Sequence, residues 1–116
     1  MPYGYTGKVL HADLTKGVLS IEEPEEKFYR TYMGGSAMGM HYVLKETPVN
    51  VDPFSPDNVL ALCTGIVTGT PISGQSRLTS VSKSPLAAIS SFIFKPLFTA
   101  SSSRGLNLVF RLSTIF

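Results

Sequence analysis

Residues 59–86 decide the fold, and they read VLALCTGIVTGTPISGQSRLTSVSKSPL. The stretch begins with the apolar run 59–62 and returns, after a loop, to an alternating pattern over residues 78–83. Apolar or alternating runs on both sides of a segment rich in Gly and Pro are typical of strands joined by a loop. We therefore predict two short strands with a loop between them.

The loop between these predicted strands ends in one cation, Arg77. It is punctuated by Gly65, Gly69, Pro71 and Gly74. Glycine lets backbone N–H groups come close to a ligand, and a guanidinium group binds phosphate through two parallel hydrogen bonds. The combination suits a phosphorylated ligand, and the alternative is that Arg77 is an ordinary surface arginine.

The composition limits the class of protein. The 116 residues are 43% apolar and 16% charged, which allows one modest core under a surface poor in charge. The net charge of +2 comes from scattered cations, so we expect no nucleic-acid partner. Apolar runs fall short of the roughly 18 residues that span a membrane, so we expect no membrane partner. The single cysteine, Cys63, excludes an intrachain disulfide and favours the cytoplasm.

Residues 3–21 predict a β-hairpin. Residues 8–14 alternate loosely, Thr15-Lys16-Gly17 supplies a turn, and residues 18–21 run back. His11 lies on the first strand without a Cys, Asp or His partner at metal-ligand spacing. We interpret His11 as a structural residue rather than a ligand or a base.

Residues 24–46 predict one or two helices. Pro24 followed by two glutamates is typical of a helix start, because carboxylates favour the positive end of a helix. This helix would run over about 24–32, and a second would follow the Gly34-Gly35 pair and end near Glu46. The predicted core-facing residues are Phe28, Tyr29, Tyr32, Met38, Tyr42 and Val43. We interpret the acidic residues at 22–26 as a solvated face, and His41 as structural.

Six short motifs follow one another in a characteristic order. They are YTGKVL (5–10), DLTKG (13–17), YMGG (32–35), DPFSPDN (52–58), TGIVTGT (64–70) and SKSPL (82–86). In this order and near this spacing they resemble the aldehyde ferredoxin oxidoreductases, over about three quarters of the chain. Each motif alone is weak evidence, whereas the set is specific.

The resemblance implies an α+β fold with a mainly antiparallel sheet. The sheet would form half of the saddle-like N-terminal domain on which a tungsten bis-pterin cofactor sits, with the helices around residues 24–46. Arg77 occupies the place of an arginine that contacts the phosphate region of the pterin, so it is the predicted cofactor-binding residue. No catalytic residue and no metal ligand is carried over.

The chain departs from the family pattern at two places. It reads Gly34-Gly35-Ser36-Ala37 where family members usually read Gly-Gly-Arg-Gly, so one cation is missing. After Leu86 the family's Gly-rich, Asn-containing segment is replaced by unrelated sequence, and no acidic residue follows Asp57. We predict a partial N-terminal domain at residues 1–86 and a divergent tail at 87–116. The tail is either out-of-frame or disordered sequence, or a real segment that packs on the sheet or on a partner.

The resemblance implies that the chain is a fragment of an enzyme that oxidises aldehydes to carboxylic acids and passes electrons to ferredoxin. The full-length family carries a tungsten (or molybdenum) bis-pterin and a [4Fe-4S] cluster, but its cluster cysteines lie downstream. Cys63 is interpreted as a small buried apolar residue. We expect no activity and no cofactor binding by the fragment alone. Expected partners are ferredoxin and an aldehyde, with the remainder of a split enzyme or a second copy as chain partners. The alternative is a small non-catalytic module that binds a phosphorylated ligand or a partner chain.

Overall fold

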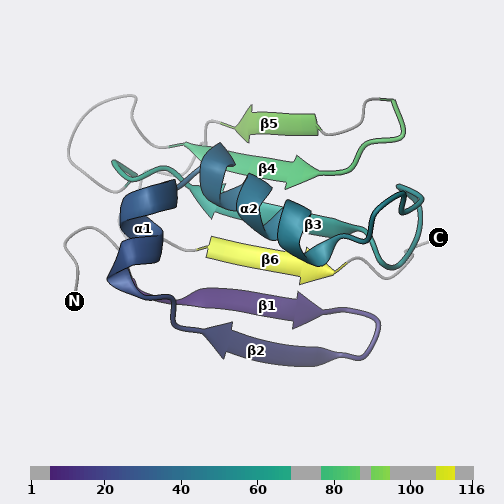
Figure 1. Ribbon diagram of the computed structural model, residues 1–116, viewed down its shortest axis with the longest axis horizontal. Helices are drawn as coiled ribbons and strands as arrows, with labels where there is room; N and C mark the ends of the chain where they lie inside the picture. Colours follow the sequence, from purple (N-terminus) through teal and green to yellow (C-terminus); the bar gives the residue numbers. More distant parts are fainter. Residues whose placement is uncertain (1–5, 69–76, 87–89, 95–106, 112–116) are drawn as a thin grey trace.

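The computed structural model describes residues 6–68, 77–86, 90–94 and 107–111. These residues form six strands and two helices, and both helices lie over one face of the sheet (Figure 1). The elements are β1 (Val9–Asp13), β2 (Val18–Glu22), α1 (Glu26–Tyr32), α2 (Ser36–Glu46), β3 (Val59–Thr64), β4 (Leu78–Ser82), β5 (Ser90–Phe94) and β6 (Asn107–Arg111).

The strands form one sheet in the order β2-β1-β6-β3-β4-β5. Every neighbouring pair is antiparallel except β1 and β6, which run parallel. The prediction of an α+β fold with a mainly antiparallel sheet is confirmed. The last strand along the chain, β6, lies between β1 and β3 in the middle of the sheet (Figure 1).

The predicted N-terminal hairpin is present as β1 and β2. Its turn is fixed by the Asp13 carboxylate, whose Oδ1 accepts hydrogen bonds from the backbone N–H groups of Thr15 and Lys16, both at 3.0 Å. Gly17 follows with a φ of +66°, a conformation that glycine adopts without steric cost. Among the described strands β2 pairs only with β1, so it forms one edge of the sheet.

The core lies between the helices and the sheet face that they cover. Its fully buried members are Val9, Tyr29, Met38, Tyr42, Val43, Val59, Ala61, Cys63 and Val81. The predictions that Met38, Tyr42, Val43 and Cys63 are buried are thus confirmed. In α1 only Tyr29 is fully buried, whereas Phe28 and Tyr32 pack partly buried against the cluster.

The loop before β3 is anchored by Asn58, which is 2% exposed. Its side-chain Nδ2 donates hydrogen bonds to the carbonyl oxygens of Pro53, at 2.8 Å, and Lys83, at 3.1 Å. The Lys83 ammonium group in turn donates to the carbonyl oxygen of Val51. The proline-rich loop 47–58 is therefore tied to the end of β4.

Two strands, β5 and β6, come from the segment predicted as a divergent tail. β5 pairs with β4, and β6 pairs with both β1 and β3. This segment therefore contributes two strands to the sheet. These pairings do not test the division into a partial domain at residues 1–86 and a divergent tail at residues 87–116, so that division stays a prediction. Neither of the two described helices is long and apolar enough to cross a membrane.

Candidate functional site

Arg77 lies at the base of the loop that joins β3 and β4, directly before β4. The Gly65 N–H donates a hydrogen bond to the Arg77 carbonyl oxygen at 3.1 Å. The Thr68 hydroxyl donates to the same carbonyl at 3.2 Å and accepts from the Arg77 N–H at 3.3 Å. The Arg77 side chain is exposed and forms no ion pair with any described residue. Its backbone is fixed while its guanidinium group faces solvent.

The start of α2 lies at the same end of the sheet. The Gly35 N–H donates to the Thr64 carbonyl oxygen at 3.0 Å, and a Cβ on Gly34 would come within 2.9 Å of that oxygen. Gly34 therefore permits the close approach of two backbones, and Gly35 has a φ of +62°, a conformation that favours glycine. The first N–H groups of a helix carry partial positive charge and lack partners within the helix. The fold thus brings the positive end of α2 to the strand end from which the Arg77 loop departs.

The remaining predicted loop residues Gly69, Pro71 and Gly74 lie outside the described residues. The role of Arg77 in binding a cofactor stays a prediction. Ser36, where the resemblance led us to expect an arginine, is exposed at the first position of α2.

A second group of polar side chains surrounds His11. Its Nε2 lies 2.8 Å from Glu22 Oε2 on β2, and its Nδ1 lies 3.3 Å from Glu46 Oε1 on α2. Lys45 Nζ lies 3.9 Å from the other oxygen of Glu22. The imidazole ring also meets the Tyr42 ring edge-on, with centroids 5.4 Å apart. His11 connects β1, β2 and α2, which agrees with its interpretation as a structural residue, although the sequence did not reveal its partners.

The pKa values of two buried groups are shifted. Burial, together with the nearby Glu22 carboxylate, raises the pKa of the Tyr42 hydroxyl. Burial alone raises the pKa of the Cys63 thiol to about 12. A thiol held protonated at neutral pH is a poor nucleophile and a poor metal ligand. Cys63 is therefore a packing residue, as the sequence indicated.

His41 is surrounded by aromatic rings. Its ring centroid lies 4.4 Å from that of Tyr32, 5.1 Å from that of Phe28 and 5.4 Å from that of Tyr42. These contacts join the two helices and are consistent with a structural role. Within the described part of the chain, no group of three or more His, Cys, Asp and Glu residues is arranged to hold a metal ion.

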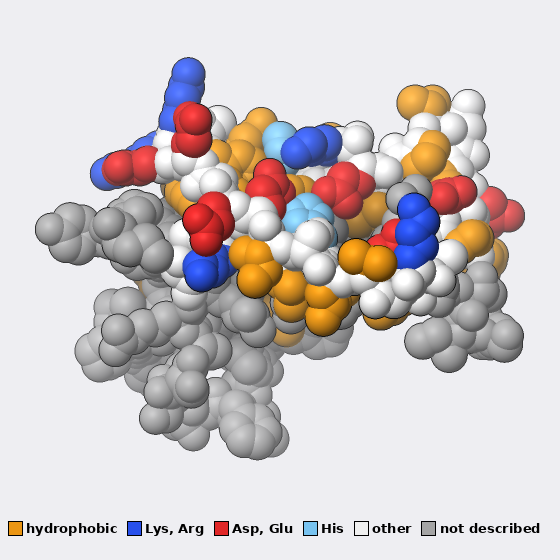
Figure 2. Space-filling view, turned by 90° about the horizontal axis from the view of Figure 1, so that it is seen from below, with side chains coloured by type: hydrophobic (Ala, Val, Ile, Leu, Met, Phe, Trp, Pro, Cys, Tyr) orange, Lys and Arg blue, Asp and Glu red, His pale blue; other side chains and the backbone are white. Residues whose placement is uncertain are grey.

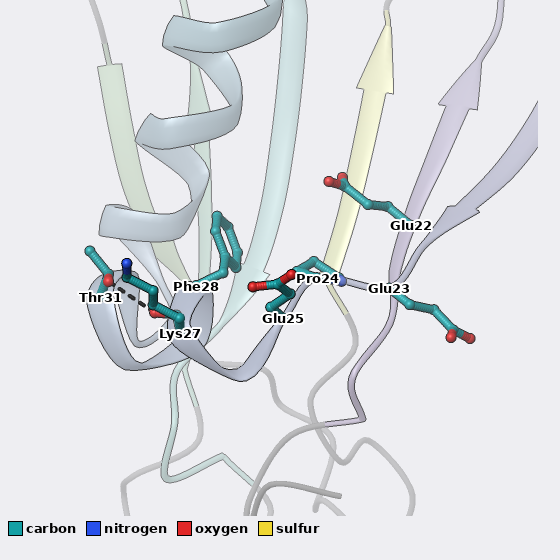
Figure 3. A pocket seen from close by; sticks show the side chains of 7 residues that line it. All are labelled: Glu22, Glu23, Pro24, Glu25, Lys27, Phe28 and Thr31. Carbon is teal, nitrogen blue, oxygen red and sulfur yellow. Dashed lines mark hydrogen bonds between the residues drawn. The ribbon is translucent and has the colours of Figure 1, made fainter.

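An open acidic pocket of about 440 Å³ lies where β2 leads into α1. It is lined by Glu22, Glu23, Pro24, Glu25, Lys27, Phe28 and Thr31 (Figure 3). In Figure 3 the side chains of Glu22 and Glu25 point to the same side, whereas Glu23 points away from them. Glu23 and Glu25 are exposed, as expected for a solvated face.

Comparison with known proteins identifies the class to which this fold belongs. The chain is similar to a solved structure described as the active-site complex BamBC of benzoyl coenzyme A reductase in complex with 1,5-dienoyl-CoA. The two share 28% sequence identity with a TM-score of 0.87, over 99% of this chain and 18% of that one. The fold is thus one found within a much larger oxidoreductase subunit.

A family model described as "Aldehyde ferredoxin oxidoreductase, N-terminal domain" matches residues 9–94. The chain therefore belongs to the aldehyde ferredoxin oxidoreductase family and corresponds to sequence of its N-terminal domain. It is 40% identical over 84 residues to the tungsten-containing aldehyde ferredoxin oxidoreductase of Pyrococcus abyssi. The matched region covers 72% of this chain and 14% of that protein. It is 34% identical over 70 residues to a protein of Pyrococcus furiosus described as "Aliphatic sulfonate oxidoreductase, WOR-like subunit", over 58% of this chain and 11% of that protein. The chain spans about one seventh of the length of the tungsten-containing relative.

Proposed function

We propose that this chain supplies part of the surface that holds a pterin cofactor in a tungsten-dependent (or molybdenum-dependent) aldehyde oxidoreductase. The observation that carries the proposal is the placement of Arg77. Its backbone is held by Gly65 and Thr68, and its exposed guanidinium group is paired with no described residue. Family membership supports the same assignment.

The residues at this end of the sheet suit a phosphorylated group. A guanidinium group and the N–H groups of a helix start are donors that bind phosphate oxygens. The cofactor would supply the oxidation chemistry when bound, and the protein would supply position and charge. In this proposal Arg77 binds the phosphate region, and the backbone of the Gly34-Gly35 turn shapes the adjoining surface.

The activity belongs, in our proposal, to a whole protein of which this chain is a part. That protein would oxidise an aldehyde to a carboxylic acid in the cytoplasm and pass electrons through a [4Fe-4S] cluster to ferredoxin. This chain contains one cysteine, and its thiol is buried and protonated at neutral pH, so the ligands of the cluster would come from elsewhere. We therefore expect the chain by itself to be inactive.

The chain alone is not expected to hold the whole cofactor, so the test uses a small part of it: binding of neopterin monophosphate to the 116-residue chain, followed by NMR or calorimetry. Charge-assisted hydrogen bonds contribute about 1.5–3 kcal/mol, so we expect Arg77→Ala to weaken binding by about tenfold or more. Arg30→Ala is the matched control, because Arg30 is exposed and, among the described residues, pairs with Glu26 on its own helix. Equal binding by wild type and Arg77→Ala contradicts the proposal.

A comparison of probes separates this function from the alternative of a general phosphate-binding module. Unphosphorylated neopterin and inorganic pyrophosphate each carry one half of the proposed ligand. If a pterin is recognised, neopterin monophosphate binds more tightly than pyrophosphate. If pyrophosphate binds equally well and Arg77→Ala weakens both, the non-catalytic module is the better description.

A further inference from the structure

The outer edge of β2 carries apolar side chains where edge strands ordinarily carry charges. The side chains of Val18, Leu19 and Ile21 are 54%, 68% and 62% exposed, and β2 pairs with no described strand except β1. Figure 2 looks onto this edge and shows hydrophobic side chains gathered along it. Proteins usually protect such edges with lysine, proline or a bulge, because an open edge offers unpaired N–H and C=O groups to another strand. Residues 18–21 contain none of these protective residues.

We propose that this edge is an interface between two copies of the chain, in which the β2 strands pair antiparallel about Ser20. Ser20 is the middle residue of β2, so this register pairs all five residues of the strand. It places Leu19 opposite Ile21 of the second copy, and the two-fold axis repeats that contact. Opposing apolar residues on neighbouring strands stabilise a sheet by about 0.2–1 kcal/mol per pair.

The pairing of β2 with β1 fixes the face on which this contact lies. Leu19 pairs with Ala12, and Ile21 pairs with Leu10. His11 and Glu22 lie on the face of the sheet that the helices cover, because His11 contacts Glu46 of α2 and Glu22 contacts Lys45 of α2. Leu19 and Ile21 belong to the other alternating set of residues, so they lie on the face away from the helices. A two-fold axis perpendicular to the sheet keeps these faces together, because residues directly opposite in an antiparallel pair lie on the same face.

Charge complementarity indicates a second copy rather than an unrelated partner. β2 begins directly after the turn that carries the exposed Lys16. At its other end β2 is followed by the residues of the acidic pocket, which include Glu25. Neither Lys16 nor Glu25 forms an ion pair with a described residue. The two-fold axis through Ser20 places the start of one β2, with the turn that carries Lys16, beside the end of the other β2, which leads into that pocket. One symmetry axis therefore satisfies both the apolar contact and the two charge contacts.

The test is a charge exchange followed by sedimentation velocity of the full 116-residue chain over a concentration series. Lys16→Glu and Glu25→Lys each place like charges at both charge contacts, so each variant alone is expected to weaken the dimer by about tenfold. An equimolar mixture restores both contacts. In the mixed dimer the carboxylate introduced at position 16 meets the ammonium group introduced at position 25, and the native Lys16 meets the native Glu25. We expect the mixture to associate within about twofold of wild type.

A second pair of variants tests the apolar contact. The double change Leu19→Lys and Ile21→Lys is expected to abolish the dimer, and circular dichroism checks that the fold is kept. Val49→Lys is the matched control, because Val49 is 92% exposed in the loop before β3 and lies on neither β2 nor the pocket. Amide exchange in β2 should slow with protein concentration in wild type and in the control only.

Three results overturn the proposal. One is a wild-type chain that stays monomeric at every concentration. Another is a mixture of the charge variants that associates no better than either variant alone. The third is association, or aggregation, that the β2 lysines do not reduce, because it would use a different surface.

Discussion

Gly39 of α2 lies directly against Val81 of β4: a Cβ at position 39 would come within 2.8 Å of Val81 Cγ2. The same added atom would lie 3.7 Å from the Cβ of Ala61 on β3. Val81 and Ala61 are both fully buried, so they have little room to move away from an added side chain. Glycine at position 39 therefore allows α2 to pack this closely on β3 and β4.

We expect Gly39→Ala to lower the free energy of unfolding by about 1 kcal/mol. Alanine favours the helix by about 1 kcal/mol, but overpacking of a filled core costs about 1–3 kcal/mol. Urea unfolding measures the difference. In the double variant with Val81→Ala the contact is relieved, so its loss of stability should be smaller than the sum of the two single losses. Simple additivity would contradict this account.

We expect His11→Ala to lower the free energy of unfolding by about 1–2 kcal/mol. The change leaves the half-buried carboxylates of Glu22 and Glu46 facing each other without the imidazole between them. Lys8→Ala is the control, because it removes an exposed ion pair with Glu23 at 3.6 Å and should change stability by less than about 0.5 kcal/mol. Equal effects of the two variants would show that the His11 contacts do not stabilise the fold.

Stability should fall as the pH rises above about 8, because the pKa of Cys63 is about 12 in the folded chain. The unfolded thiol, with an ordinary pKa of about 8.5, loses its proton first. The folded state then holds more protons than the unfolded state, so rising pH favours unfolding. Between about pH 8 and about pH 9.5 we expect a loss of about 1 kcal/mol in urea unfolding. Cys63→Ala should lose less over the same interval, and an equal loss would assign the effect to other groups.

Truncation after residue 86 should abolish cooperative unfolding. The cut removes β5 and β6, and β6 is the strand that joins β1 to β3. Circular dichroism and urea titration of residues 1–86 test this expectation. Removal of residues 112–116 alone is the control, since they lie beyond the end of β6. A cooperatively folded chain of residues 1–86 would instead support the division into a domain and a dispensable tail.

The sequence predicted those strands, turns and helix starts that a short stretch of neighbouring residues specifies. Apolar residues from 59 onward indicated β3, and the alternation from residue 78 indicated β4. The turn at 15–17 indicated the hairpin, and the residues around Pro24 and Gly34-Gly35 indicated both helix starts. Each of these signals lies within a few residues of the element that it specifies, so neighbours in sequence were enough.

Long-range pairings could not be predicted in the same way. The parallel pairing of Val9 with Asn107 joins opposite ends of the chain, and no periodicity records it. The partners of His11 are similar: Glu22 and Glu46 come from two other elements, so no metal-ligand or base spacing revealed them. Arg77 could be proposed as a binding residue because it is the cation at the end of a Gly-rich loop, and that role stays a prediction. The Thr68 contacts that fix its backbone depend on the path of the loop, which the sequence does not give.

The middle position of β6 has a consequence for biosynthesis. While a ribosome makes the chain, the β1–β2 hairpin and the β3–β4 pair emerge early, but no strand can join them until residue 111 is synthesised. Pairing residue 9 with residue 107 closes a loop of nearly the whole chain, and such distant contacts form slowly. The inner edges of both hairpins stay open during that time and can pair with other nascent chains. We therefore expect the chain's need for chaperones during translation to depend on how soon β6 is synthesised, and not on the stability of the completed sheet.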